Sequence, residues 1–245
     1  MKTLYLRDEN YNWVAHQYEG LEDLKAEFEE RKISIGYRAS IGDRASIGYG
    51  ASIGYGASIG NRASIGDDAS VGDRASIGDR ASIGDGASIG YGASIGDGAS
   101  VGDGASIGYG ASVGDRASVG DRASIGDRAS IGDGASIGYG ASIGDGASIG
   151  YGASIGNRAS IGYGASIGND ARLINGFYLN GSQHTVTYTG NGGMAIGCKN
   201  NTIEWFEKHY ESLGKSENYT NEQIKEYAFY IKMARQFHEE FYANK

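Results

Sequence analysis

The sequence has few of the features that mark a secreted, membrane-bound or nucleic-acid-binding protein. Its 245 residues include one cysteine, Cys198, so no internal disulfide can form, and this fits a reducing compartment. The N-terminus alternates charged and apolar residues, so we expect neither a signal peptide nor a membrane span. A formal net charge of −8 argues against a partner held mainly through phosphates. We therefore expect a cytoplasmic protein without a nucleic-acid or membrane partner.

A six-residue repeat dominates the chain. Ile or Val recurs at every sixth position from Ile35 to Ile167, which makes 23 units without an insertion, and Leu173 continues the register. Each unit reads Ala-Ser-Ile-Gly followed by two variable residues. This period does not fit one face of an α-helix, whereas Ala-Ser-Ile suits a short strand and the remaining residues suit a turn. The pattern predicts a parallel β-helix in which each strand pairs with the strand one coil away.

The repeat resembles that of the bacterial transferase hexapeptide-repeat family. Residues Ile35 to Ser40 match the family unit in order, with an aliphatic residue, Gly, two variable residues, a small residue and one more. The chain is also similar to hexapeptide-repeat proteins of phages and gut bacteria. The resemblance implies a mainly β fold, a left-handed triangular β-helix of about eight coils with three units each, and a homotrimer.

The flanks differ from the repeats and divide the chain into three parts. Residues 1–32 indicate a hairpin and a helix, residues 33–173 the β-helix, and residues 174–245 a hairpin followed by two helices. Solenoids need ends that cover the last open coil, so we expect both flanks to act as caps. The C-terminal helices carry more apolar surface than one helix needs, so we also expect them to assist oligomerisation.

Two local signals predict where the C-terminal helices begin and end. Gly214 follows an apolar helical pattern and is expected to stop the first helix. Thr220 and Gln223 have the spacing of a capping box and are expected to open the second helix.

The two variable positions of each unit carry the chemical variety of the coils. The first is Tyr, Asp or Asn, and the second is Gly, Arg or Asp. Seven of the eight Tyr residues at the first position precede Gly. Asp and Asn tolerate a positive φ angle and Tyr does not, so we expect Asp and Asn to adopt it themselves and Tyr to leave it to the next Gly.

Positions eighteen residues apart stack along one edge of the expected prism, and Tyr concentrates on one of the three edges. Aromatic faces can bind bases, sugars or a partner surface. Another interpretation is that the rings stack on one another and only stabilise the turns. A second edge collects Asp and Arg, which we interpret as a solvated charge network. The candidate ligand-binding residues are Tyr55, Tyr91, Tyr109 and Tyr163.

Catalytic candidates are scarce. The family resemblance implies acyl transfer with a His general base between neighbouring prisms, often beside a projecting loop. In this chain all four His residues lie outside the repeats, and no loop interrupts the hexads. His184 is the one weak catalytic candidate, while Cys198 is expected at a strand end before a helix as a small buried thiol. No metal, phosphate-loop or CxxC motif occurs, so we expect no metal site and no cofactor.

Three functions compete at this point. We favour a non-catalytic scaffold or binding protein, trimeric, that presents or sequesters a small-molecule or protein ligand along the β-helix edges. The alternative is a hexapeptide-repeat acyltransferase that uses coenzyme A, with His184 or another cap residue. The third is an ice-binding protein, because successive Ser residues form flat outward ladders; one Ser column per face makes it the least favoured.

Overall fold

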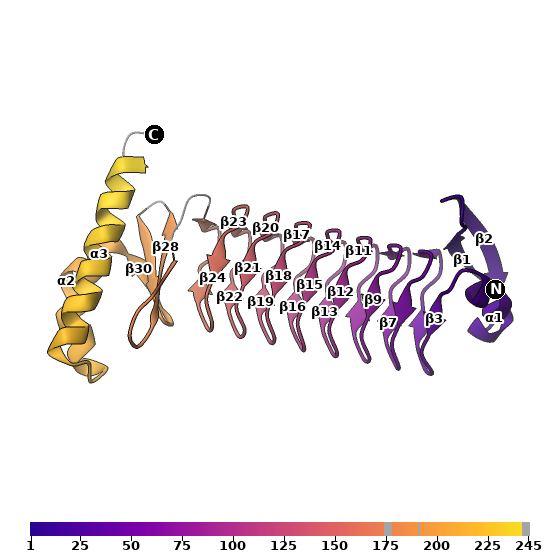
Figure 1. Cartoon of the computed structure of the whole chain (residues 1–245), viewed down its shortest axis with the longest axis horizontal. Coiled ribbons are helices and arrows are strands. Elements are labelled where there is room, and N and C mark those ends of the chain that lie inside the picture. The colour runs from indigo at the N-terminus through magenta and orange to yellow at the C-terminus, as the bar shows by residue number, and fades with distance from the viewer. Residues whose placement is uncertain (174–177, 191, 242–245) are drawn as a thin grey trace.

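The protein is an elongated rod with a different structural unit at each end (Figure 1). The computed structural model describes residues 1–173, 178–190 and 192–241. The repeats form the middle of the rod, the N-terminal strands and short helix lie at one end, and a small sheet with two long helices lies at the other. No helix in these three ranges is long and apolar enough to span a bilayer.

The N-terminal unit extends one face of the coils. Strands β1 (Lys2–Arg7) and β2 (Trp13–Tyr18) form an antiparallel hairpin, followed by the 3-10 helix η1 (Leu21–Leu24) and the short helix α1 (Lys25–Glu30). Strand β1 also pairs in parallel with β5, a strand of the first coils. Leu4 and Leu6 on β1 are fully buried, so the hairpin covers the open end of the apolar stack.

Up to Leu173, where the first described range ends, the coils contain twenty-four short parallel strands, eight on each face of the prism. The face that continues β1 contains β5 (Ala45–Ile47), β8 (Ser64–Ile65), β11 (Ser82–Ile83), β14 (Ser100–Val101), β17 (Ser118–Val119), β20 (Ser136–Ile137), β23 (Ser154–Ile155) and β26 (Arg172–Leu173). The second face contains β3 (Ser34–Ile35), β6 (Ser52–Ile53), β9 (Ser70–Val71), β12 (Ser88–Ile89), β15 (Ser106–Ile107), β18 (Ser124–Ile125), β21 (Ser142–Ile143) and β24 (Ser160–Ile161). The third contains β4 (Ser40–Ile41), β7 (Ser58–Ile59), β10 (Ser76–Ile77), β13 (Ser94–Ile95), β16 (Ser112–Val113), β19 (Ser130–Ile131), β22 (Ser148–Ile149) and β25 (Ser166–Ile167).

Identical layers explain why the repeat is so strict. Ile89 on β12 pairs with Val71 on one side and Ile107 on the other, so three hexads make one coil as expected. Its side chain is 2% exposed, whereas the neighbouring Ser88 points outward. Burial of one such side chain stabilises the fold by about 1.5–3 kcal/mol. Each coil therefore contributes the same core layer, and a change in one layer affects both neighbouring layers.

The turns confirm that Tyr leaves the positive φ angle to the next Gly, and they correct the expectation for Asp and Asn. The positive φ angle lies on the second variable residue of the units, as in Gly92 (63°), Arg80 (60°) and Asp68 (54°), and not on the Asp or Asn before it. The Asp or Asn at the first variable position instead accepts a hydrogen bond through its side chain from the backbone one coil earlier. Asp97 accepts from the backbone N–H of Asp79 at 2.8 Å. Asp and Asn thus serve as hydrogen-bond acceptors that link the turns of successive coils.

The C-terminal unit is an antiparallel sheet covered by two helices (Figure 1). The expected hairpin is present as β28 (Thr185–Gly190) and β29 (Gly193–Ile196), although Asn191 of its turn lies outside the described residues. Strands β27 (Tyr178–Asn180) and β30 (Lys199–Thr202), which sequence reasoning missed, flank this hairpin. Helices α2 (Ile203–Ser216) and α3 (Asn221–Phe241) pack together and share a core with the sheet.

Of the two expected helix boundaries, one is confirmed and one is wrong. The backbone N–H of Thr220 donates to the Gln223 side chain at 2.8 Å, and the Gln223 N–H donates back to the Thr220 hydroxyl at 3.2 Å, which is the expected capping box. Helix α2, however, continues through Gly214 to Ser216. A Cβ atom on Gly214 would lie 2.7 Å from Cγ1 of Ile224. The glycine therefore allows close packing of Ile224 against α2 and does not end the helix.

Candidate functional site

The expected Tyr edge exists, but its rings form separate groups. Tyr91 and Tyr109 stack with ring centroids 5.5 Å apart and planes 8° from parallel. Tyr37 and Tyr55 lie 6.1 Å apart with their planes tilted by 38°. Tyr163 lies three coils beyond Tyr109 and is 79% exposed. The four candidate residues therefore do not form one continuous aromatic surface.

Arginine side chains occupy the outer faces of the central Tyr pair. The guanidinium of Arg74 lies 5.6 Å from the Tyr91 ring centroid and donates to its hydroxyl at 2.7 Å, while that of Arg128 lies 5.8 Å from the Tyr109 ring. Cation–π contacts of this kind stabilise exposed pairs by about 0.5–1 kcal/mol. This geometry supports self-stacking for Tyr91 and Tyr109, because a flat ligand would have to displace an arginine.

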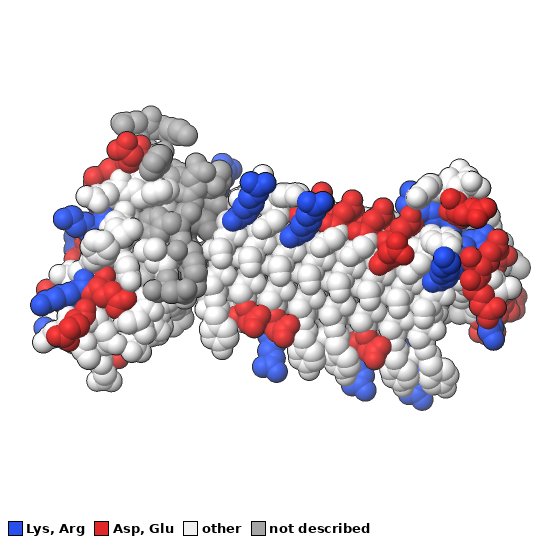
Figure 2. Space-filling view, viewed as in Figure 1, with Lys and Arg blue, Asp and Glu red and all other residues white. Residues whose placement is uncertain are grey.

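Charged side chains lie along the edges of the rod, and the coil face in view is uncharged (Figure 2). Along one edge they line an open groove of about 630 Å³. Its carboxylates are already engaged, since Asp79 and Asp97 each accept a backbone N–H from the preceding coil. The geometry agrees with a solvated charge network whose first role is to join the turns. The groove is lined by Asp43, Asn61, Arg62, Asp79, Arg80, Asp97, Gly98 and Arg116.

A site of different character lies in the C-terminal unit, where the sheet meets α2 and the start of α3. It is a cavity of about 40 Å³, which we call the C-terminal cavity. Its deeper wall is apolar and buried, as at Phe206, whereas polar side chains such as His184 and Lys199 are exposed. The full lining is His184, Ile196, Cys198, Lys199, Phe206, Tyr210, Leu213, Gly214, Glu217, Tyr219, Ile224 and Tyr227.

Tyr219 positions His184 at the rim of the C-terminal cavity. The Tyr219 hydroxyl and Nδ1 of His184 are 2.5 Å apart, and the two rings lie nearly parallel. Tyr227 holds the backbone on the other side, because its hydroxyl accepts the His184 N–H and donates to the His184 carbonyl at 2.9 Å. Burial and the neighbouring Tyr227 hydroxyl raise the pKa of Tyr219 well above its usual value. Tyr219 is therefore a neutral hydrogen-bonding partner for the imidazole.

Cys198 differs from the expectation of a buried thiol at the end of a strand before a helix. It lies in the two-residue turn between β29 and β30, and it is exposed at the cavity. The preceding Gly197 has a φ of +56°, and a Cβ there would lie 2.5 Å from Cδ2 of His184. The glycine provides the positive φ of a tight hairpin turn and lets the backbone approach the imidazole. Cys198 and His184 consequently line the same cavity.

This arrangement places an imidazole beside a small cavity with an apolar wall. Lys199 and Glu217 form an ion pair at the rim, with Nζ 3.5 Å from Oε1 and both side chains about half exposed. Sequence reasoning identified His184 and Cys198 but missed Tyr219 and Lys199. The signal for Tyr219 was its position immediately before the capping box at Thr220, a place where the chain turns back toward the sheet.

Two family models match the repeats. The bacterial transferase hexapeptide model matches residues 62–97 and 122–157, and the model for the hexapeptide repeat of succinyl-transferase matches residues 32–72 and 146–180. The chain is a hexapeptide-repeat protein, and its coils form the left-handed parallel β-helix that the sequence indicated. No curated protein matches the sequence.

Several solved structures resemble the chain. A mutant of GDP-perosamine N-acetyl transferase from Caulobacter crescentus, in complex with CoA and GDP-perosamine, is 22% identical over 40% of this chain and 49% of its own, with a TM-score of 0.38. This chain thus spans about half the length of that protein. UDP-N-acetylglucosamine O-acyltransferase from Moraxella catarrhalis is 20% identical over 58% and 65%, with a TM-score of 0.40. A hexapeptide transferase family protein from Anaplasma phagocytophilum is 15% identical over 85% and 92%, also with a TM-score of 0.40.

Proposed function

We propose that the protein is an acyltransferase whose chemistry takes place at the C-terminal cavity and whose coils are a rigid support. Both matching family descriptions refer to transferases, which favours acyl transfer over the non-catalytic scaffold that the sequence first suggested. Residues 33–172 contain no His, Cys, Lys or Glu. The coils offer only Asp, Tyr and Arg as titratable groups, so we place the general base in a terminal unit that contains His. Coenzyme A thioesters are the donors that the family suggests.

The observation that carries this proposal is the contact between His184 and Tyr219 at the rim of an apolar cavity. In the tautomer that donates Nδ1–H to the Tyr219 oxygen, Nε2 of His184 is able to accept a proton. A fixed ring orientation places that nitrogen in one direction, which is what general-base catalysis requires.

The proposed reaction needs one base, His184, which removes a proton and later returns it. Nε2 of His184 removes the proton from an acceptor hydroxyl or amine as the acceptor attacks the thioester carbonyl. The carbon–sulfur bond then breaks, and the departing thiolate takes the proton from the imidazolium. The acyl group ends on the acceptor, free thiol is released, and His184 returns to its neutral form.

The test is conversion of acetyl-coenzyme A to free coenzyme A, followed by chromatography with a set of amine and hydroxyl acceptors. Loss of a general base lowers rates by about 10²–10⁴-fold, and we expect that loss for His184→Ala. His209→Ala is the matched control, since His209 stacks on Trp205 on an exposed part of α2 and does not line the cavity. Equal rates for wild type and His184→Ala would overturn the proposal.

A second candidate function is non-catalytic binding along the Tyr edge, in a homotrimer. The observation in its favour is the exposure of Tyr37 and Tyr163, 74% and 79%, at the two ends of that edge. Large exposed aromatic rings are typical of binding surfaces. Mass spectrometry of protein purified from its native lysate tests for a co-purifying ligand, and changing Tyr37 and Tyr163 to Ser should abolish its retention. Light scattering that reports a monomer would contradict the trimer.

A further inference from the structure

We propose that the C-terminal cavity accepts an acyl group of only two or three carbons, and that Leu213 and Ile224 set this limit. The inference rests on the proposed function, because it names the substrate class of the same site. Neither the family descriptions nor the repeats specify this property, since the cavity lies in the C-terminal unit and outside the coils.

The size of the cavity limits the acyl group. The cavity has a volume of about 40 Å³, and one water molecule needs about 10–15 Å³ on this measure. The space therefore holds about three water-sized groups, which corresponds to an acetyl or propionyl group. A hexanoyl chain would need to move the walls.

The walls of the cavity cannot recede easily. The α2 residues that line the cavity lie on one face of the helix, and Phe206 among them is fully buried. Ile224 at the start of α3 is pressed against Gly214, where even one added carbon would come within 2.7 Å of it. Leu213 and Ile224 are only partly buried, so they are the wall residues whose truncation disturbs the core least.

The rim and the deeper wall of the cavity differ in polarity. The polar side chains of His184, Cys198 and Lys199 are exposed at the rim. The deeper wall is apolar and combines Ile196 of the sheet with Phe206, Leu213 and Ile224 of the helices. A thioester carbonyl is stabilised beside polar groups, and an alkyl chain is stabilised by apolar burial. The acyl group is therefore oriented with its carbonyl toward His184 and its methyl end toward the helices.

The test compares acetyl-, propionyl-, butyryl- and hexanoyl-coenzyme A as donors. Wild type should convert acetyl and propionyl donors at least tenfold faster than hexanoyl. Leu213→Ala and the milder Ile224→Val should extend the accepted chain by one or more carbons. Leu179→Ala is the matched control, because Leu179 packs on the same core and does not line the cavity. Thermal unfolding checks that each variant is folded.

A binding measurement separates this inference from the proposed function. Methyl resonances of Leu213 and Ile224 are followed while acetate, propionate, butyrate and hexanoate are added to the full-length protein. Shifts confined to the two shortest acids support the size limit even if no transfer occurs, in which case only the proposed function fails. Equal conversion or binding of hexanoyl and acetyl groups by wild type, or no shift with any acid, overturns the inference.

Discussion

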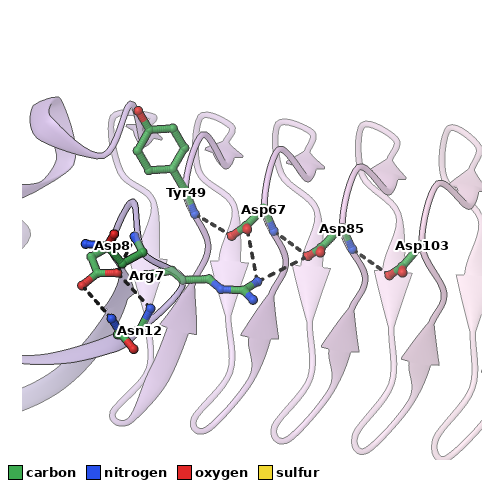
Figure 3. Close-up of polar contacts among 8 residues, drawn as sticks. Arg7, Asp8, Asn12, Tyr49, Asp67, Asp85 and Asp103 are labelled. Atoms are coloured by element: carbon green, nitrogen blue, oxygen red, sulfur yellow. Dashed lines mark hydrogen bonds and ion pairs between the residues drawn. The ribbon is translucent and has the colours of Figure 1, made fainter.

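The guanidinium of Arg7 lies 3.1 Å from the carboxylate of Asp67 and joins the N-terminal hairpin to the first coils (Figure 3). The same nitrogen lies 4.0 Å from Asp85, so one arginine faces two members of an aspartate column. Tyr11 and Trp13 flank the guanidinium at 5.1 and 5.5 Å from their ring centroids. The contact therefore fixes the hairpin to the rod through both charge and packing.

Arg7→Ala should lower the free energy of unfolding by about 1–3 kcal/mol, since Asp67 is largely buried and would lose its charged partner. Arg44→Ala is the control, because Arg44 and Asp43 are 3.7 Å apart and about half exposed, which limits their contribution to about 0–1 kcal/mol. Urea unfolding measures both. If Arg7→Ala and Arg44→Ala lose equal free energy of unfolding, the Arg7 contact is no stronger than a surface ion pair.

Asp97 should be replaceable by Asn but not by Ala. Its Oδ1 accepts the Asp79 N–H at 2.8 Å, an acceptor that Asn keeps and Ala removes. We expect Asp97→Ala to cost about 0.5–1.5 kcal/mol and Asp97→Asn to cost less, because Asn keeps the acceptor oxygen. If Asn is as harmful as Ala in urea unfolding, the carboxylate charge and not the acceptor is what matters.

Arg80→Gly should stabilise the protein. Arg80 has a φ of 60°, a conformation that costs a residue with a side chain about 1–2 kcal/mol and costs glycine almost nothing. Arg80→Ala removes the same charge but keeps the strained backbone, so it should bring no gain. If the melting temperature rises equally in both variants, the stabilisation comes from loss of the charge and not from relief of the backbone strain.

The apolar stack should be intolerant of charge. Ile89→Asp places an unpaired carboxylate where 2% of the side chain is exposed, and we expect a loss above about 4 kcal/mol or failure to fold. Ser88→Asp puts the same group on the outer face one residue away and should change stability by about 0.5 kcal/mol at most. Circular dichroism during heating compares the two, and near-wild-type melting of Ile89→Asp would contradict a buried column.

The sequence was sufficient to predict the coils because their order is local and periodic. Ile89 repeats the environment of Val71 and Ile107, so one unit contains the information for all of them. The φ angles of the turns were predicted in part. The Gly after Tyr has the expected positive φ, as at Gly92 (63°), whereas in the turns that begin with Asp or Asn the strain lies on the next residue, as at Arg80.

The candidate site could be predicted only in part. His184 was visible as a lone His in a hairpin, but its partner Tyr219 is 35 residues away and reaches it through the packing of the helices on the sheet. The exposure of Cys198 depends on the turn that follows β29, and the helical pattern did not show that Gly214 brings Ile224 against the cavity. Such contacts arise from tertiary packing without a repeat to indicate them.

The most direct test of the account is the rate of acetyl-coenzyme A conversion by a protein that lacks one coil, residues 87–104, measured beside His184→Ala. The deletion joins Gly86 to Ala105 and keeps the six-residue register, so the remaining coils should stack and the C-terminal cavity should be unchanged. We expect kcat/KM within about twofold of wild type for the deletion and a loss of about 10²-fold or more for His184→Ala. A folded deletion variant without activity, or a fully active His184→Ala, would contradict a catalytic site in the C-terminal unit supported by an inert rod.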